Sequence, residues 1–374
     1  MADPVTQDPT LAALVEQVRD AAARRQPLCI RGSGSKDFYG GPLIGEPLSL
    51  GELRGISSYE PTELVVTARA GTPLAELEAA LAEKGQWLPF EPPRFGHTPG
   101  GGPGGGTVGG MVAAGLAGPA RAALGGVRDY VLGATLLNGQ AELLSFGGQV
   151  MKNVAGYDVS RMLAGSMGVL GVICEVSLKV LPVPPATATL RFDLDQVNAL
   201  KRVNDWAGQP LPLQASAWWD GALIVRLGGA AAAVESAIRK LGGEPIEPAL
   251  AARFWADLRD QRDEFFSTAR AAVAEGAVLW RLSVAPTAPK IALSGDTLIE
   301  WGGGCRWLVS RDSAETVRAA ALDARGHATA WWGGERTGEV FSPLSPALLR
   351  IHHRLKQAFD PAGIFNRQRL HPAF

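Results

Sequence analysis

Two glycine-rich segments carry the residue types that can bind a phosphate. In the first, RGSGSK over residues 31–36, two glycines alternate with two serines and a lysine follows. Gly32 and Gly34 tolerate positive φ, so that successive N–H groups can converge on an anion, and Ser33 and Ser35 add hydroxyl donors. A plain turn from a strand into a loop accounts for the same residues equally well.

The second segment, GGGTVGGMVAA over residues 104–114, lacks Cβ atoms where an apolar helix is expected to begin. Gly109 and Gly110 would let the backbone approach a flat or charged ligand, and a helix N-terminus favours negative charge. The alternative is a flexible loop before a tightly packed helix. The two segments lie about 70 residues apart, and together they indicate an extended ligand with a diphosphate in its middle.

Neither segment fits the two commonest nucleotide motifs. A literal G-x-G-x-x-G occurs at Gly100, Gly102 and Gly105, but the residues before it, FEPPRFGHTP, do not read as a strand. A dinucleotide fingerprint needs that strand, so the Rossmann interpretation is rejected. The chain also lacks G-x-x-x-x-G-K-[ST], which excludes a P-loop NTPase.

The elements that must position these loops are predicted from periodicity and turn residues. Apolar spacing predicts a first helix over 10–25 with Thr10 as its N-cap. Asn138-Gly139 between two apolar runs predicts a hairpin. A strand is expected at 27–30, and a strand, a turn and a helix over 64–85. In that helix Thr72 is the expected N-cap and Pro73 the first helical residue. A loop, a helix, a glycine-rich turn and a long strand are expected over 153–185.

Prolines 182, 184 and 185 break the chain, and we place a domain boundary there. The domains expected are 1–185, 186–335 and a C-terminal segment, 336–374, which contains a helix ended by Asp360-Pro361. The middle domain is predicted to be α+β, with its helices on one face of a sheet. Its expected strands are 222–229, 277–286, 297–310 and 328–334, and its expected helices 231–243 and 313–326.

Composition excludes several classes of protein. The chain has 374 residues, 46% of them hydrophobic, and a formal net charge of −1, which does not indicate nucleic-acid binding. We expect no signal peptide, no transmembrane segment and a cytoplasmic location. The basic C-terminal stretch, 343–374, is either a solvated helix face or a docking patch. Most of the ten tryptophans lie in the middle domain, where we expect them to pack in the core and at interfaces.

Metal and redox centres built by this chain are not expected. Cys29, Cys174 and Cys305 lie far apart and form no C-x-x-C pair, which argues against a disulfide framework, an iron–sulfur cluster or a zinc site. His352 and His353 are adjacent on a predicted helix, so their side chains point about 100° apart and do not chelate one metal.

Longer motifs resemble a known family. PLCIRGSGSK, GGTVGGMVAAGLAGP, GGVRDYVLGATLLNGQ, KNVAGYDVSRMLAGSMGVLGVICEVSLKVLP and FDPAGIFN occur in the order seen in FAD-binding proteins of the PCMH type, the vanillyl-alcohol oxidase and D-lactate dehydrogenase superfamily. Within it the chain is most similar to FAD-binding (E) subunits of bacterial glycolate oxidase. The resemblance covers 27–185 and the C-terminal segment strongly and the middle domain thinly. It implies a two-part FAD-binding domain and a ferredoxin-like α+β cap.

The resemblance assigns FAD contacts residue by residue. The implied pyrophosphate loop consists of Gly32, Ser33, Gly34, Ser35 and Lys36, and the residues along the flavin side are Pro99 and Gly100. The loop around the diphosphate and flavin edge consists of Gly105, Gly106, Thr107, Gly109 and Gly110, followed by Gly118. The adenine–ribose end is held by Gly168, Val172 and Ile173, and the tail asparagine that returns toward the flavin is Asn366.

Departures from the family pattern also carry information. The first loop contains neither His nor Cys, so the FAD is expected to be non-covalent. Met167 stands where many relatives have a glutamate, and Gly115 where many have an asparagine. Both changes move the pocket away from that of a complete dehydrogenase.

Oxidation of a 2-hydroxy acid needs a base for the hydroxyl proton and a cation for the carboxylate. His97, near the flavin loop, is the best base candidate, and Arg336 in GGERTG the best carboxylate-binding candidate, although a structural role explains each of them better. The histidine-rich segment resembling HxGDGNxH, which related dehydrogenases carry, is missing.

Three functions therefore remain open. The first is an FAD-carrying subunit of a larger glycolate oxidase, with a sister flavin subunit, an iron–sulfur subunit that receives the electrons, and peripheral membrane association only through these partners. The second is a free-standing flavin dehydrogenase for a small 2-hydroxy acid. The third is a flavin-less scaffold subunit of the same fold.

Overall fold

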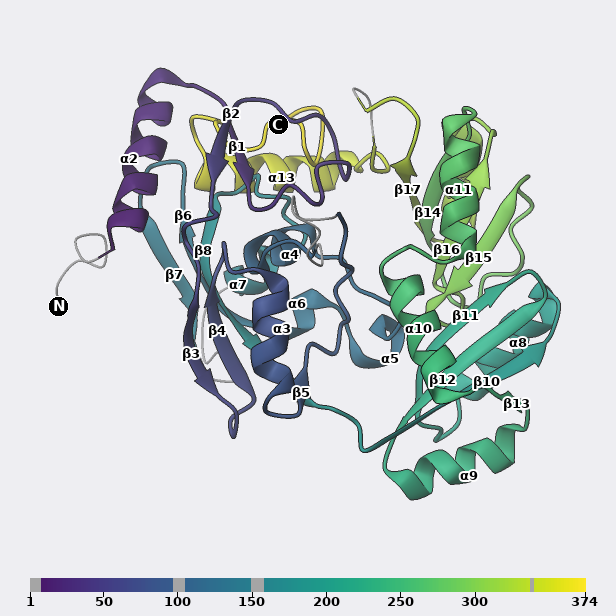
Figure 1. Cartoon of the computed structure of the whole chain (residues 1–374). Coiled ribbons are helices and arrows are strands. Elements are labelled where there is room, and N and C mark those ends of the chain that lie inside the picture. Colours follow the sequence, from purple (N-terminus) through teal and green to yellow (C-terminus); the bar gives the residue numbers. More distant parts are fainter. Residues whose placement is uncertain (1–7, 97–104, 149–157, 337–339) are drawn as a thin grey trace.

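The computed structural model describes residues 8–96, 105–148, 158–336 and 340–374. The chain forms two halves that lie side by side, the first half (residues 8–185) and the second half (186–336), and the tail (340–374) returns over the first half (Figure 1). His97, Pro99 and Gly100, three of the expected site residues, lie outside the described residues.

An antiparallel five-stranded sheet in the order β3-β4-β8-β6-β7 forms the centre of the first half. A parallel pair, β1-β2, and a short pair, β5-β9, accompany it. The strands are β1 (Leu28–Arg31), β2 (Glu46–Ser49), β3 (Ile56–Glu60), β4 (Val65–Arg69), β5 (Gln86–Trp87), β6 (Val131–Leu137), β7 (Leu143–Gly147), β8 (Val172–Lys179) and β9 (Leu181–Pro182).

Helices pack on this sheet and bring the two glycine-rich loops together. They are α2 (Pro9–Arg24), α3 (Leu74–Ala82), α4 (Val108–Ala114), α5 (Arg121–Leu124), α6 (Val127–Tyr130) and α7 (Val159–Met162). The first loop follows β1, and the second leads into α4. None of the helices in the described part of the chain is both long enough and apolar enough to cross a membrane.

The second half contains an eight-stranded sheet in the order β13-β10-β12-β11-β15-β16-β14-β17. Its strands are β10 (Ala186–Asp193), β11 (Leu213–Trp219), β12 (Ala222–Gly229), β13 (Glu244–Pro245), β14 (Val278–Ser283), β15 (Asp296–Glu300), β16 (Cys305–Ser310) and β17 (His327–Trp332). Its helices are α8 (Gln196–Ala207), α9 (Ala231–Leu241), α10 (Pro248–Arg259), α11 (Glu264–Ala274) and α12 (Ala314–Asp323), with a 3-10 turn η1 at Trp301–Gly303.

Both faces of this sheet carry helices, so the expectation of helices on one face is wrong. Residues of α8 and α9 share a core with one face of β10 and β12, and α12 covers the same face of β14 and β17. Residues of α10 and α11, among them Trp255 and Phe266, belong instead to the core that continues into the first half. Neither α10 nor α11 was predicted from the sequence.

Several element boundaries also differ from expectation. The N-cap of α2 is Asp8, which accepts from the amides of Thr10 and Leu11, because a carboxylate before Pro9 caps better than Thr10 inside the helix. Thr72 does not cap α3; its hydroxyl bonds with the backbone of Gly55. The run 297–310 is two strands, divided by the turn at Trp301–Gly303.

The hairpin at Asn138-Gly139 is confirmed as a pairing of β6 with β7, but its connection is longer than two residues. Leu137 pairs with Leu143, and the Asn138 side-chain oxygen accepts from the amides of Gln140 and Glu142. Asparagine thus closes the loop by its side chain rather than by a tight two-residue turn.

A buried ion pair within the tail holds an ammonium group that bonds to the first half. Helix α13 (Pro346–Phe359) ends at Asp360, as expected, and Lys356 reaches Asp360 at 2.6 Å. The Lys356 ammonium also donates to the carbonyls of Val169 and Phe365, while Asp360 accepts from the amides of Ile364 and Phe365. Burial lowers the pKa of Lys356, and the Asp360 carboxylate opposes that shift.

We expect Asp360→Ala to destabilise the protein by about 2–4 kcal/mol, because it leaves the Lys356 charge and two amides buried without their acceptor. Urea unfolding measures the loss. Asp20→Ala is the matched control, since Asp20 also pairs with a cation four residues away but both side chains are exposed. Equal shifts in the two variants would contradict the role given to burial.

Candidate functional site

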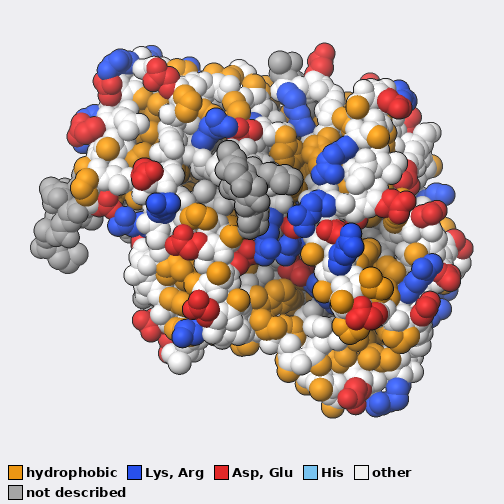
Figure 2. All heavy atoms as spheres, in the orientation of Figure 1, with side chains coloured by type: hydrophobic (Ala, Val, Ile, Leu, Met, Phe, Trp, Pro, Cys, Tyr) orange, Lys and Arg blue, Asp and Glu red, His pale blue; other side chains and the backbone are white. Residues whose placement is uncertain are grey.

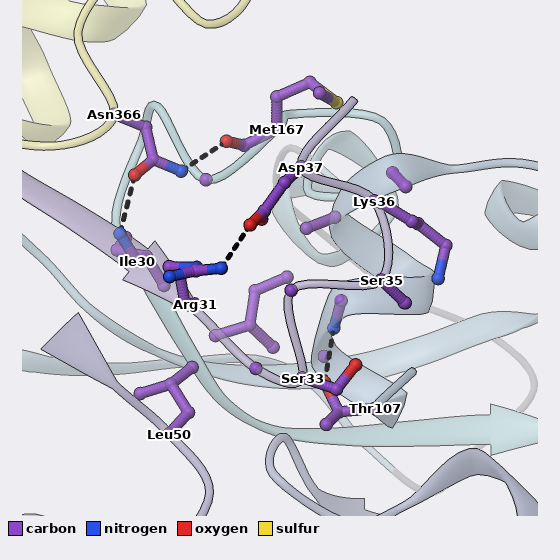
Figure 3. Close-up of a pocket in the computed structure, with 18 of the residues that line it drawn as sticks. Ile30, Arg31, Ser33, Ser35, Lys36, Asp37, Leu50, Thr107, Met167 and Asn366 are labelled. Carbon is purple, nitrogen blue, oxygen red and sulfur yellow. Dashed lines mark hydrogen bonds and ion pairs between the residues drawn. The ribbon is translucent and has the colours of Figure 1, made fainter. Parts of the chain in front are cut away.

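A cavity opens where the first loop, the start of α4, the turn after α7 and the tail meet (Figure 3). These elements are far apart in sequence, and the cavity exists only because the tail returns to β1. Its lining includes Ile30, Arg31, Gly32, Ser33, Gly34, Ser35, Lys36, Asp37, Leu50, Thr107, Gly109, Gly110, Ala113, Met167, Gly168, Ile173 and Asn366.

The first loop is folded around an internal ion pair. Arg31 at the end of β1 pairs with Asp37 across the loop, as Figure 3 shows. Gly34 has φ +75°, and its carbonyl accepts from the Asp37 amide at 3.0 Å. The pairing uses the only carboxylate in the loop, so Lys36 is left without an acidic partner within the loop.

Three polar side chains of this loop converge on the second loop. A Cβ atom placed on Gly106 would lie 2.8 Å from the Ser35 hydroxyl and 2.9 Å from the Lys36 ammonium, with the Ser33 hydroxyl 3.8 Å away. Gly106 has φ +85°, which favours glycine. Two hydroxyl groups and an ammonium therefore gather around bare backbone, which is a donor set suited to phosphate oxygens.

The electrostatics of Lys36 agree with an anion site. Burial lowers the pKa of Lys36 to about 8, because the charged form loses hydration. No ion pair joins Lys36 to any of the acidic residues that the structure describes. An anion bound beside it would restore the ordinary pKa and recover the desolvation cost.

The second loop is packed too closely for side chains. A Cβ on Gly32 would lie 2.3 Å from the Thr107 hydroxyl oxygen, so the two loops touch without room for a methyl group. A Cβ on Gly109 would lie 2.5 Å from the Ala70 Cβ. The Gly109 amide donates to the Ala70 carbonyl at 2.8 Å. Gly109 is thus required for packing against the residue after β4, a reason that the sequence alone did not reveal.

Thr107 organises the entry into α4. Its hydroxyl accepts from the Gly110 amide at 3.3 Å, which caps the helix. Its backbone bridges to Pro73 at the start of α3. These bonds fix Thr107 and the start of α4.

The tail completes the cavity through Asn366 and Arg369. The Asn366 side chain accepts from the Ile30 amide and donates to the Met167 carbonyl, both at 2.7 Å. Arg369 is buried, and its guanidinium donates to the carbonyls of Lys36, Asp37, Tyr39 and Gly41. Arg369 was counted only as part of a basic tail in the sequence, since nothing local reveals a partner more than 300 residues away.

The structure gathers most of the described site candidates at this cavity. Its lining contains Gly32, Ser33, Gly34, Ser35, Lys36, Thr107, Gly109, Gly110, Gly168, Ile173 and Asn366. Gly106 and Val172 are adjacent in sequence to lining residues and Gly105 is two residues from Thr107, but these three do not themselves line it. Sequence reasoning missed Arg31, Asp37 and Leu50, whose side chains carry no motif of their own.

Gly118 lies elsewhere, at the boundary between the halves. Its carbonyl accepts from the Trp301 indole at 3.0 Å, and a small cavity there is lined by Gly118, Trp301 and Glu300. Glu300 accepts from the Trp307 indole at 2.7 Å, and burial raises its pKa to about 7. Tryptophans thus fill this boundary, in keeping with their expected packing role.

The two catalytic candidates gain no support from the geometry. His97 is outside the described residues. The Arg336 guanidinium donates to the carbonyls of Ala330 and Trp331 at the end of β17, and it lines neither this cavity nor the other described ones. Among the residues described, no three His, Cys, Asp or Glu side chains gather as metal ligands. All three cysteines are buried and free.

Comparison with known proteins shows to which class of protein the chain belongs. Residues 9–147 match the FAD binding domain family. The fold resembles a crystal structure of alkyldihydroxyacetonephosphate synthase, with a TM-score of 0.60 at 16% identity over 94% of this chain and 74% of that one. The residues present fit the cofactor, because the donors around Gly106 suit its diphosphate. The chain is a flavoprotein of the FAD-linked oxidoreductase class.

A sequence relative defines the family more narrowly. The chain is 46% identical to the glycolate oxidase subunit GlcE of Escherichia coli over 96% of its own length and 97% of that protein. It is 29% identical to the glycolate oxidase subunit GlcD of Bacillus subtilis over 47% of this chain and 36% of GlcD. It therefore belongs to the GlcE family of glycolate oxidase subunits, and the resemblance found in the sequence is confirmed.

We expect Gly109→Ala to lower the free energy of unfolding by about 1–3 kcal/mol, because the methyl group must displace the backbone beside Ala70. Gly105→Ala, in the same loop, is the control: its nearest heavy atom, on Leu74, is 4.0 Å from the added Cβ. Urea unfolding without added FAD separates packing from ligand binding. Equal stability of the two variants would refute the packing role of Gly109.

Proposed function

We propose that this protein is the FAD-binding subunit of a glycolate-oxidising complex that converts a small 2-hydroxy acid to the 2-oxo acid. The observation that carries the proposal is the 46% identity to GlcE over nearly the full length of both chains. Because the match includes the second half, it supports more than a shared cofactor fold. The donors gathered around Gly106 support the cofactor part independently.

The residues of the cavity would divide the binding of FAD among them. Lys36 and the hydroxyls of Ser33 and Ser35 would neutralise and orient the diphosphate. Ile173 and Leu50 offer apolar walls beside it. When bound, FAD supplies the acceptor for the hydride of the substrate. The individual contacts proposed here rest on the cavity of this chain.

The division into domains is also a proposal. Residues 1–185 would form the FAD-binding domain, 186–335 the cap, and 336–374 a segment returning to the first. The order β10-α8-β11-β12-α9-β13, with strand order β13-β10-β12-β11, supports a ferredoxin-like first part of the cap. The strands β15-β16-β14-β17 with α12 support a second, related part.

Partner subunits are proposed from the chemistry of electron transfer. Burial raises the pKa of Cys174 and Cys305 to about 12, so neither thiol is poised as a thiolate ligand. Electrons leaving the flavin would then pass to an iron–sulfur subunit, while a sister flavin subunit would carry out much of the substrate oxidation. A free-standing 2-hydroxy-acid dehydrogenase and a flavin-less scaffold are the alternatives.

Anaerobic addition of glycolate to the purified chain, alone and with its co-purifying partners, tests these functions. We expect a flavin spectrum that bleaches promptly only when the partners are present. Prompt bleaching of the lone chain would overturn the subunit assignment in favour of a free-standing enzyme. A chain without flavin absorbance, even after FAD is added, would leave only the scaffold.

We expect Lys36→Met to weaken FAD binding by about tenfold to a hundredfold, because it removes the charge beside the diphosphate. Titration of the apoprotein with FAD, followed by flavin fluorescence, measures the change. Lys84→Met removes a lysine just after α3, where the side chain is exposed, and should bind FAD as the unaltered chain does. Equal affinities in both variants would exclude Lys36 from the site.

A further inference from the structure

A further cavity, the α10 cavity, lies where β10 and β12 of the large sheet meet α10. Its volume is about 330 Å³, within the range of ligand sites. The residues of β5 and of the connection from β9 to β10 close it on the side of the first half. It shares no lining residue with the FAD cavity, and the sheet order places it at the end remote from β14 and β17. Figure 2 shows a hollow between the two halves, with hydrophobic side chains along its lower part.

A buried amide without a protein partner lines the α10 cavity. The pairing of β11 with β12 skips Gln214, which is therefore the extra residue of a β-bulge. A Cβ atom placed on Gly228 of β12 would lie 2.3 Å from the Gln214 amide nitrogen, so this amide lies directly over bare backbone. Gln214 is only 7% exposed, yet its side chain bonds to none of the residues that the structure describes. Such an amide is costly to bury, and a ligand with matching groups removes the cost.

Aromatic and small apolar side chains form the walls around this amide. Trp87 of β5 and Trp255 of α10 both line the cavity. The Trp255 indole donates to the Thr189 hydroxyl at 3.0 Å, which orients the ring and leaves the hydroxyl proton for another acceptor. Thr189 lies on the same face of the sheet as Gly228, and so beside the Gln214 amide. The space in front of Trp255 is kept open by small residues of α10, which are Ala251, Ala252 and Ala256.

The charges at this cavity neutralise one another. Its charged lining residues are Glu91, Arg226 and Arg259. Arg226 pairs with Glu91 at 2.8 Å, and the second carboxylate oxygen of Glu91 accepts from the Ala120 amide. Arg259 pairs with Asp260 through two hydrogen bonds of 2.8 Å. The groups left for a ligand are therefore the neutral amide of Gln214 and a hydroxyl proton, which favours an uncharged ligand over an anion or a cation.

We propose that the α10 cavity binds a neutral, planar heteroaromatic ring with an amide edge, either a carboxamide or a cyclic lactam. The Gln214 side chain donates to the ligand carbonyl and accepts from the ligand N–H, because two amides complement each other in this way. The Thr189 hydroxyl donates to the same carbonyl, and Trp255 lies against the ring. The Gln214 amide is too deeply buried to bond with the backbone of a peptide lying in the opening. The site does not depend on the function proposed for the FAD cavity.

Isothermal titration of the FAD-saturated full chain with nicotinamide and with uracil tests the proposal. We expect saturable binding of at least one of them, weakened about tenfold or more by Gln214→Leu, which removes both amide contacts. This variant is expected to fold, because the Gln214 amide has no bond within the described protein to lose. Ala252→Phe, at an exposed position of α10 that lines the cavity, should weaken binding as much by filling the space. Nicotinate and orotate, which carry a carboxylate on the same rings, should bind about tenfold more weakly than their neutral counterparts.

Gln17→Leu is the matched control, since Gln17 is exposed on α2 and does not line the cavity. Its variant should bind the rings as the unaltered chain does. Absence of saturable binding of both rings, equal affinity for a ring and its carboxylate, or unchanged affinity in Gln214→Leu would each overturn the proposal. Binding of a proline-rich peptide in place of the rings would overturn it in favour of a peptide groove. Because FAD content is read separately from its absorbance, these outcomes are distinct from a failure of flavin binding.

Discussion

The hydrogen bonds between the tail and the first loop are the constraint on which the rest of the site depends. Arg369 holds the carbonyls of residues 36, 37, 39 and 41, and Asn366 joins β1 to the turn at Met167. The loop that carries Lys36 has no regular structure of its own. Its shape is therefore set by residues more than 300 positions away, and the Lys356–Asp360 pair fixes those residues in turn. A buried pair of this kind specifies position as much as it stabilises.

Glycine serves two different physical needs within one short run. At Gly106 the missing side chain leaves room for the ammonium and hydroxyls of the first loop, which is a need of the ligand site. At Gly109 it leaves room for Ala70, which is a need of the protein core. Composition alone does not separate these roles, because both appear as glycine beside an apolar helix. Only the position of the neighbouring backbone distinguishes them.

The sequence predicted those helices and strands that are determined by interactions between residues close together in the chain. Strand β12, helix α9 and the end of α13 fall where periodicity and proline placed them. The resemblance of long motifs to a family predicted the cofactor and most lining residues. Three features were not predicted. Asp8 rather than Thr10 caps α2, and α10 and α11 cover the sheet face turned to the first half. Arg369 donates to backbone carbonyls that are distant in sequence. Periodicity does not encode such partners, since they are set by tertiary packing.

Unpaired positive charge gives a physical criterion for where ligands bind in this chain. The net charge is −1, so acidic residues are available to neutralise cations. Arg226 uses one of them, pairing with Glu91 at 2.8 Å where both side chains are nearly buried. Lys36 has no such partner among the described residues, although burial makes an unpaired charge costly. Folding alone gives no reason to keep a buried lysine in this state. An anion bound beside Lys36 removes the cost, and the diphosphate of FAD has the charge to do so and the acceptor oxygens for the hydroxyls of Ser33 and Ser35.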